Sequence, residues 1–231
     1  MDKLKQAIRA VAEELAGRIQ AGATLGLGSG STVAALLDEL SPLLKKAGGM
    51  TGVTTSTQIE TVAAKNGIEI VPFRGSVDLV LDGADQVDSE LNLIKGGGGA
   101  LLKEKVLMSG AKSIAIVAGE HKFAGRLCEN GVVVPVEVFP LARQSAKARL
   151  TELGGRPEER LLPKGYPYFT ENGNLILDTA FPPIKNPREL EVMVKTVPGV
   201  AEVGIFTFKP ITVFRLSDDG SYDELKRLGP K

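Results

Sequence analysis

The chain has 231 residues, and its 28 Lys and Arg are balanced by 28 Asp and Glu, with one Cys and no Trp. This balance leaves no overall basic field that would attract nucleic acid or anionic lipid, so any anion must be bound at a local site. A single cysteine cannot form an intrachain disulfide and no apolar run reaches membrane-spanning length, which favours a cytoplasmic protein without nucleic-acid or membrane partners.

The first 130 residues predict alternating helices and strands. Apolar spacing predicts a helix over 3–20, and a strand in 23–30 turns into a helix over 31–49 that we expect Ser31 or Thr32 to cap. Alternation of this kind predicts an α/β, Rossmann-like fold, with an open, mostly parallel sheet and helices on both faces. Further strands are expected at 50–55, 68–73, 77–83 and 113–119, and helices at 57–66 and 99–110.

A change of pattern near residue 131 predicts a second, smaller domain. The order of elements from there is β-α-β-β-α-β, which is typical of a compact, ferredoxin-like α+β unit. The segment 211–228 then returns to the first domain. We expect a Rossmann-like catalytic domain of residues 1–130 and 204–231, and a small α+β domain of residues 131–203.

The sequence GLGSGSTV at 26–33 has the composition of a phosphate-binding loop. Glycines allow a ligand to approach the backbone, and the start of the next helix presents free N–H groups. The spacing is not the dinucleotide pattern G-x-G-x-x-G, and the lysine that precedes the Ser/Thr of a P-loop is missing. A phosphate ester therefore fits best. An ordinary turn remains the alternative. The hydroxyls of TTSTQ at 54–58 either join this site or, through Ser56 or Thr57, cap the next helix.

Two aspartates follow the apolar run VDLVL in the sequence DGADQVDSELNLIKGGGG at 82–99. Asp82 and Asp85 are expected at the carboxyl edge of the sheet, where open α/β sheets bind ligands. The alternative, that aspartates cap a turn and face water, explains Asp88 and Glu90 better than Asp82. A carboxylate magnesium site at Asp82 and Asp85 is also compatible with the pattern.

The sequence KGGGGALLKEK at 95–105 places a second glycine run before a helix. Four adjacent glycines are costly unless a ligand touches the backbone, and Lys95 adds a localised cation. Glu104 is either functional or one member of a solvated KEK face. Cys128 is interpreted as a small, partly buried residue, and His121 as a loop residue near the active edge.

These groups together suit proton transfer next to a carbonyl. A carboxylate removes the proton, a cation or N–H group stabilises the enediolate oxygen, and a remote phosphate supplies binding energy. The four motifs GLGSGST, DGADQVD, KGGGGALLKEK and VPVEVFP, together with ELGGRPEER and NGNLILD, resemble ribose-5-phosphate isomerase, type A, in order and spacing over nearly the whole chain.

The resemblance implies interconversion of D-ribose 5-phosphate and D-ribulose 5-phosphate through a cis-enediolate, without metal or cofactor, in the non-oxidative pentose phosphate pathway. It implies that Glu104 moves a proton between C1 and C2, that Asp82 and Asp85 hold sugar hydroxyls and assist ring opening, and that Lys95 stabilises oxyanion charge. The implied substrate-binding residues are Lys5, Ser29, Gly30, Ser31, Thr32, Asp82, Gly83, Ala84, Asp85, Lys95, Gly96, Gly97, Gly98 and Lys122.

The sequence departs from the family pattern in three places, the third being the C-terminal segment FKPITVFRLSDDG at 208–220, and two other functions stay open. Ser29 stands where the family usually has threonine, and AGEHK replaces a segment that often contains aspartate. An acyl or coenzyme A transferase with Glu104 as nucleophile is one alternative, and a sugar-phosphate sensor is the other, although one helix before the first strand leaves no room for a helix-turn-helix. The resemblance further implies a homodimer or homotetramer.

Overall fold

The computed structural model describes residues 3–208 and 210–229, and the chain divides into two compact units. Unit 1 contains the described residues of Met1–Ala84, Lys103–Lys122 and Phe208–Lys231. Unit 2 contains Asp85–Leu102 and Phe123–Thr207. No helix in the described ranges is long and apolar enough to cross a membrane.

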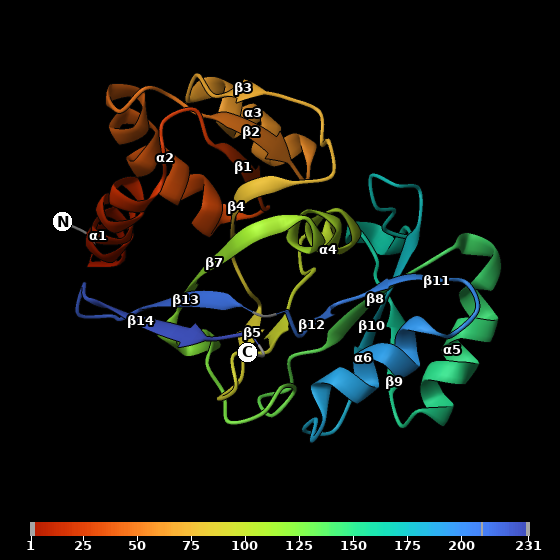
Figure 1. Cartoon of the computed structure of the whole chain (residues 1–231). Coiled ribbons are helices and arrows are strands. Elements are labelled where there is room, and N and C mark those ends of the chain that lie inside the picture. Colours follow the sequence, from red (N-terminus) through yellow and green to blue (C-terminus); the bar gives the residue numbers. More distant parts are fainter. Residues whose placement is uncertain (1–2, 209, 230–231) are drawn as a thin grey trace. The chain divides into compact units, whose positions relative to one another are not determined.

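Unit 1 is built on a seven-stranded sheet in the order β14-β13-β7-β4-β1-β2-β3 (Figure 1). Six strands are parallel, and β14 pairs antiparallel with β13 at one edge. This confirms the predicted Rossmann-like, mostly parallel sheet. The strands are β1 (Thr24–Leu27), β2 (Thr51–Thr54), β3 (Glu69–Ile70), β4 (Val77–Asp82), β7 (Ala111–Gly119), β13 (Ile211–Leu216) and β14 (Tyr222–Arg227).

Helices cover both faces of this sheet. On one face, buried leucines of β1 and β4 share a core with α1 (Lys3–Arg18), α2 (Ser31–Lys46) and α3 (Thr57–Lys65). On the other face, Gly26 of β1 lies so close to α4 (Leu101–Ser109) that an added Cβ would be 3.3 Å from Leu107. The side chains therefore alternate between two apolar layers, as a parallel sheet buried on both faces requires.

Unit 2 has the predicted β-α-β-β-α-β order and an additional small sheet. Its four antiparallel strands are arranged β11-β8-β10-β9, and a second sheet has the order β12-β6-β5. The elements are β8 (Val134–Val138), α5 (Arg143–Glu152), β9 (Arg156–Glu159), β10 (Leu175–Ala180), α6 (Pro187–Lys195), β11 (Val200–Val203), β5 (Gln86–Val87), β6 (Leu93–Ile94) and β12 (Ile205–Phe206). Short 3-10 turns lie at Pro140–Ala142 and Pro163–Gly165 in unit 2 and at Glu120–Lys122 in unit 1.

The bounds of the two units differ from the expected domains at 85–102, 123–130 and 204–207, which lie in unit 2. The physical reason for the first and third segments is strand pairing, since β6 pairs with both β5 and β12. In the segment 123–130, Leu127 and Cys128 pack in the apolar core of unit 2. The β5–β6 hairpin turns at Asp88, whose carboxylate accepts hydrogen bonds from the N–H groups of Glu90 and Asn92 at 2.9 and 2.8 Å. Asp88 thus caps a turn as expected, but it is buried and does not face water.

A bidentate ion pair joins the end of α1 to the edge strand β14. The Arg18 guanidinium donates to both carboxylate oxygens of Glu224, at 2.6 and 2.8 Å. This pair lowers the pKa of Glu224 from 4.5 to about 2 and raises the pKa of Arg18. Because the folded pKa of Glu224 is depressed, the pair stabilises the fold fully above about pH 4.5, and this contribution declines as the pH falls toward 2.

We expect Glu224→Gln to lower the melting temperature at pH 7 by about 1 to 3 °C, since partly exposed ion pairs contribute modestly. The difference from the unmodified protein should shrink between pH 5 and pH 3. Glu13→Gln is the matched control because it removes an exposed carboxylate that pairs with Arg9 on the same helix. A Glu224→Gln difference that stays constant over this pH range, measured by circular dichroism melting, would contradict the assignment.

Candidate active site

The glycine-rich loop after β1 is fixed by a cluster of three hydroxyls. The Ser29 hydroxyl lies 2.8 Å from the Thr55 hydroxyl and donates to Ser56 at 2.8 Å. Ser56 in turn accepts a hydrogen bond from the N–H of Ile59 and caps α3, so the expected helix cap and the hydroxyl cluster are the same structure. The loop of β1 and the loop of β2 therefore meet at the carboxyl edge of the sheet.

The expectation that Ser31 or Thr32 caps α2 is wrong. The N-cap is Gly30, with φ 103° and no side-chain hydrogen bond to the helix, and Ser31 and Thr32 already belong to the first turn. A positive φ at this position favours glycine, which has no side chain to act as a cap. The first turn of α2 thus begins without a side-chain cap, and Ser31 is exposed at its start.

Asp82 lies at the end of β4, directly beside the loop of β1. The Gly28 N–H donates to the carbonyl of Leu81 at 2.8 Å, which continues the β1–β4 pairing to the edge of the sheet. A Cβ added at Gly28 would lie only 2.0 Å from the Asp82 carboxylate, so glycine is required there by close approach. Asp82 is 1% exposed, and its Oδ1 accepts a hydrogen bond from the Gly83 N–H at 2.8 Å.

Glu104 lies in the first turn of α4 and is 4% exposed. The interpretation as part of a solvated KEK face is therefore wrong for this residue, and its neighbour Lys105 is also buried. Burying a carboxylate is unfavourable unless the site uses or compensates the charge. Glu104 is thus set apart from the exposed glutamates of the surface helices.

Unit 2 contains the remaining central residues, Asp85, Lys95 and the glycine run. Asp85 accepts a hydrogen bond from the Gly97 N–H at 2.7 Å, and its own N–H donates to Ile94 at 2.8 Å. Lys95 follows β6, is 3% exposed, and places its ammonium 5.7 Å from the centre of the Phe206 ring. A cation over the face of an aromatic ring is attracted to it, so this contact helps to fix the position of Lys95.

The peripheral candidates differ from one another in their surroundings. Lys5 on α1 is exposed and forms a 3.8 Å ion pair with Glu39, while Lys122 is half-buried in the 3-10 turn after β7. His121 lies in the same turn and is exposed, as its interpretation as a loop residue expected. Cys128 is buried, which raises the pKa of its thiol to about 11 and agrees with a structural role.

The site residues that the sequence predicts therefore fall into two groups, one in each unit. Unit 1 holds Lys5, Ser29, Gly30, Ser31, Thr32, Asp82, Gly83, Ala84, Glu104 and Lys122, and unit 2 holds Asp85, Lys95, Gly96, Gly97 and Gly98. The chain passes between the units at Ala84–Asp85 and again at Leu102–Lys103. Within the described ranges, no cluster of three or more His, Cys, Asp or Glu side chains is arranged to hold a metal ion.

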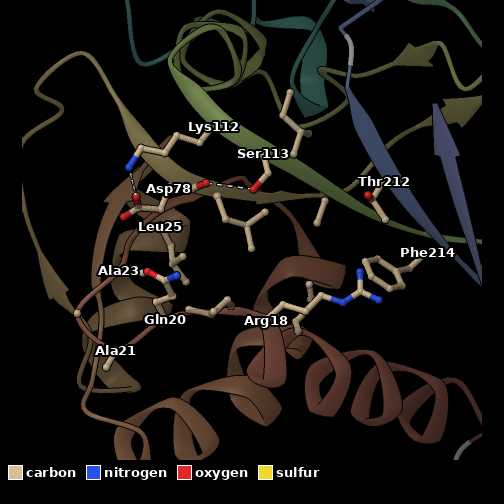
Figure 2. A pocket seen from close by; sticks show the side chains of 16 residues that line it. Arg18, Gln20, Ala21, Ala23, Leu25, Asp78, Lys112, Ser113, Thr212 and Phe214 are labelled. Carbon is tan, nitrogen blue, oxygen red and sulfur yellow. Dashed lines mark hydrogen bonds and ion pairs between the residues drawn. The ribbon is translucent and has the colours of Figure 1, made fainter. Parts of the chain in front are cut away.

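A cavity of about 610 Å³ lies at the opposite edge of the unit 1 sheet (Figure 2). It is formed where β1, β4, β7 and β13 begin and α1 ends, and none of the predicted site residues lines it. Its lining includes the small side chains of Ser113, Ala115 and Thr212. At its rim the Lys112 ammonium contacts Asp78 at 2.7 Å and lowers the pKa of that carboxyl.

Two residues that sequence reasoning missed contact the glycine run. Arg160 donates to the carbonyls of Gly96 and Gly97, and the Tyr168 hydroxyl donates to that of Gly98. They are separated from the glycines by more than sixty positions, at 63 to 70 residues. The motif ELGGRPEER includes Arg160, but no local pattern in the sequence connects it with the glycines.

Comparison with known proteins shows similarity to one enzyme family. The family model "Ribose 5-phosphate isomerase A (phosphoriboisomerase A)" matches residues 51–220. Ribose-5-phosphate isomerase A of Methanosarcina acetivorans is 41% identical over 202 residues, covering 86% of this chain and 85% of the relative.

Solved structures give the same result over almost the full length. Ribose 5-phosphate isomerase A of Methanocaldococcus jannaschii has a TM-score of 0.88 at 33% identity, covering 97% of this chain and 98% of that one. A D-ribose-5-phosphate isomerase in complex with phospho-erythronic acid has a TM-score of 0.89 at 34% identity, with the same coverage. This chain therefore belongs to the ribose-5-phosphate isomerase A family.

Proposed function

We propose that this chain, which as a member of its family interconverts ribose 5-phosphate and ribulose 5-phosphate in the pentose phosphate pathway, uses Glu104 as the catalytic base. The observation that carries the proposal is the burial of Glu104 in the first turn of α4, directly after the glycine run. Family membership favours the isomerase over the transferase and the sensor.

The reaction moves one proton between carbons and one between oxygens. Glu104 removes the proton from C2 of the open-chain aldose, and the electrons shift to the C1 oxygen to give a cis-enediolate. The same carboxyl then returns the proton to C1, while the proton of the C2 hydroxyl is transferred to the C1 oxygen. One positioned carboxylate can serve both carbons because they are adjacent.

The remaining residues are proposed to bind the substrate and to stabilise charge. The uncapped first turn of α2, with Ser31 and Thr32, is suited to the phosphate, because its N–H groups and the helix dipole attract an anion. Asp82 and Asp85 would hold sugar hydroxyls and assist ring opening. Lys95, with the glycine N–H groups, would stabilise the enediolate oxygens, and Lys5 and Lys122 would add cationic contacts.

The ligand of one relative supports this assignment. Phospho-erythronic acid combines a phosphate with a planar carboxylate, and a carboxylate resembles an enediolate in carrying delocalised negative charge on two oxygens. A site that stabilises an enediolate is expected to bind such an acid well. We infer that this chain takes a sugar phosphate of the same class and needs no metal or cofactor.

The cytoplasmic location and the homodimer or homotetramer stay predictions. Several large apolar side chains of unit 2 are exposed and would suit subunit contacts, among them Phe139, Leu141, Tyr166 and Phe169. Analytical ultracentrifugation of the purified chain measures the oligomeric state directly.

Assays of ribose 5-phosphate isomerisation test the base and the need for a metal. They compare the unmodified protein in excess EDTA with the Glu104→Gln variant. We expect full activity in EDTA and a kcat reduced by about 10²-fold to 10⁴-fold in the variant, which is the usual contribution of a general base. Glu60→Gln is the matched control, because Glu60 also lies in the first turn of a helix but is exposed. Activity lost to EDTA would reassign Asp82 and Asp85 as metal ligands, and an unimpaired Glu104→Gln would remove the proposed base.

Substitution of Gly28 tests the role of Asp82 without altering its carboxylate. Because an added Cβ would overlap that carboxylate, Gly28→Ala must displace Asp82, and we expect kcat/KM to fall by at least about 10-fold. Gly17→Ala, on α1 with open space around the added methyl, is the control and should keep full activity. Steady-state kinetics with ribose 5-phosphate provide the readout, and equal activity of the two variants would argue against a role for Asp82.

A further inference from the structure

Side chains of unit 2 hold three consecutive carbonyls of the glycine run. Arg160 Nη1 donates to the carbonyl oxygens of Gly96 at 3.0 Å and Gly97 at 2.9 Å. The Tyr168 hydroxyl donates to the carbonyl oxygen of Gly98 at 3.1 Å. Glycine backbone is otherwise the most easily deformed part of a chain, so these contacts determine its conformation.

Arg160 is itself fixed from several directions. Its guanidinium forms a fork with Asp178 of β10, with Nη2–Oδ1 and Nε–Oδ2 distances of 2.5 and 2.8 Å. The side chain of Arg160 is only 16% exposed and lies 5.8 Å from the centre of the Tyr168 ring. A planar, bidentate guanidinium has little freedom to move its remaining N–H groups.

The segment that carries Tyr168 is anchored as well. The Tyr168 N–H donates to the carbonyl of Arg160 at 3.0 Å. Two positions further on, the Thr170 hydroxyl donates to the fully buried Glu137 at 2.9 Å, and Asn174 donates to the same carboxylate oxygen at 2.9 Å. Both anchors of the glycine run therefore rest on the antiparallel sheet of unit 2.

Because the peptide bond is planar, the contacts that hold the glycine carbonyls also set the direction of the neighbouring N–H groups. A carbonyl and the following N–H share one plane and point in opposite directions, so holding the first aims the second. The N–H of Gly97 is used by Asp85, and the N–H of Gly99 donates to Gly96 at 2.9 Å. Between them, the Gly98 N–H has no acceptor in the part of the chain that the structure describes, and Gly98 is exposed, with open space beside it.

We propose that Arg160 and Tyr168 are positioning residues that aim the Gly98 N–H at the negative oxygen formed during isomerisation. Arg160 holds the carbonyl in the same peptide as this N–H, and Tyr168 holds the next peptide. The inference rests on the proposed role of the glycine run in stabilising the enediolate. It adds a function for two residues beside the four-stranded sheet, in the segment between β9 and β10, which the family motifs at the carboxyl edge do not include.

The test compares Arg160→Met and Tyr168→Phe with Arg143→Met in the full chain. Arg143 is the matched control because it also pairs with a carboxylate of the four-stranded sheet, Glu159 of β9 at 3.5 Å, but has no hydrogen bond to the glycine run in the described part of the chain. We expect kcat to fall about 10-fold to 10²-fold in Arg160→Met and about 3-fold to 10-fold in Tyr168→Phe. KM should change less than about 3-fold, because an oxyanion donor acts mainly in the transition state.

Chemical rescue separates positioning from a general loss of structure. Guanidinium chloride, far below denaturing concentration, should restore part of kcat to Arg160→Gly and none to Arg143→Gly. Arg160→Lys should stay impaired, because an ammonium lacks the planar fork. If Arg160→Met fails to fold, Tyr168→Phe, which keeps the ring and loses one hydrogen bond, still decides the question.

The proposal is overturned if folded Arg160→Met and Tyr168→Phe keep kcat within about 2-fold, or if their losses appear only in KM. It is also overturned if Arg143→Met loses as much kcat as Arg160→Met. Glu104→Gln, measured in parallel, distinguishes this failure from failure of the proposed site. A slow Glu104→Gln beside unimpaired Arg160 variants refutes only the positioning role, whereas an active Glu104→Gln refutes the base itself.

Discussion

The parallel register of β1 and β4 is the constraint on which unit 1 depends. It brings the ends of the two strands to one edge and places Gly28 against the Asp82 carboxylate, where any side chain at position 28 would overlap it. The loop after β1 can therefore pass close to a buried aspartate only because it begins with glycine. The same edge receives the hydroxyls of Thr55 and Ser56 from β2, which hold Ser29 in place.

The constraint on unit 2 is different, because a flexible glycine backbone must be kept in one conformation. Its glycine run has little side chain to pack, so order must come from hydrogen bonds to the carbonyls. Arg160 and Tyr168 supply these bonds. Asp178 in turn holds Arg160, and Glu137 holds the segment that carries Tyr168. The antiparallel sheet is thus connected to the glycine run through a short series of polar contacts.

Much of the fold and part of the site could be predicted from local patterns. Helical and strand spacing predicted the parallel sheet and the β-α-β-β-α-β unit, and the positions of Asp82 and Ser29 after their strands predicted their common edge. The cap of α2 was mispredicted because a glycine with positive φ looks, in sequence, like an ordinary loop residue beside two better capping residues. Glu104 could be interpreted as a surface residue because a charged KEK triplet does not reveal which of its members is buried.

The sequence by itself determined the fold class and the family, because periodicity and glycine-rich motifs are formed by neighbouring residues and can be recognised without the structure. Only the tertiary structure decided which groups are buried and which distant residues meet. Burial of Glu104 depends on what packs around α4, and the contact of Arg160 with Gly97 closes a separation of 63 residues. Such contacts depend on how the strands pair, as in the β12-β6-β5 sheet that brings residues 85–102 into unit 2, and no local pattern contains that information.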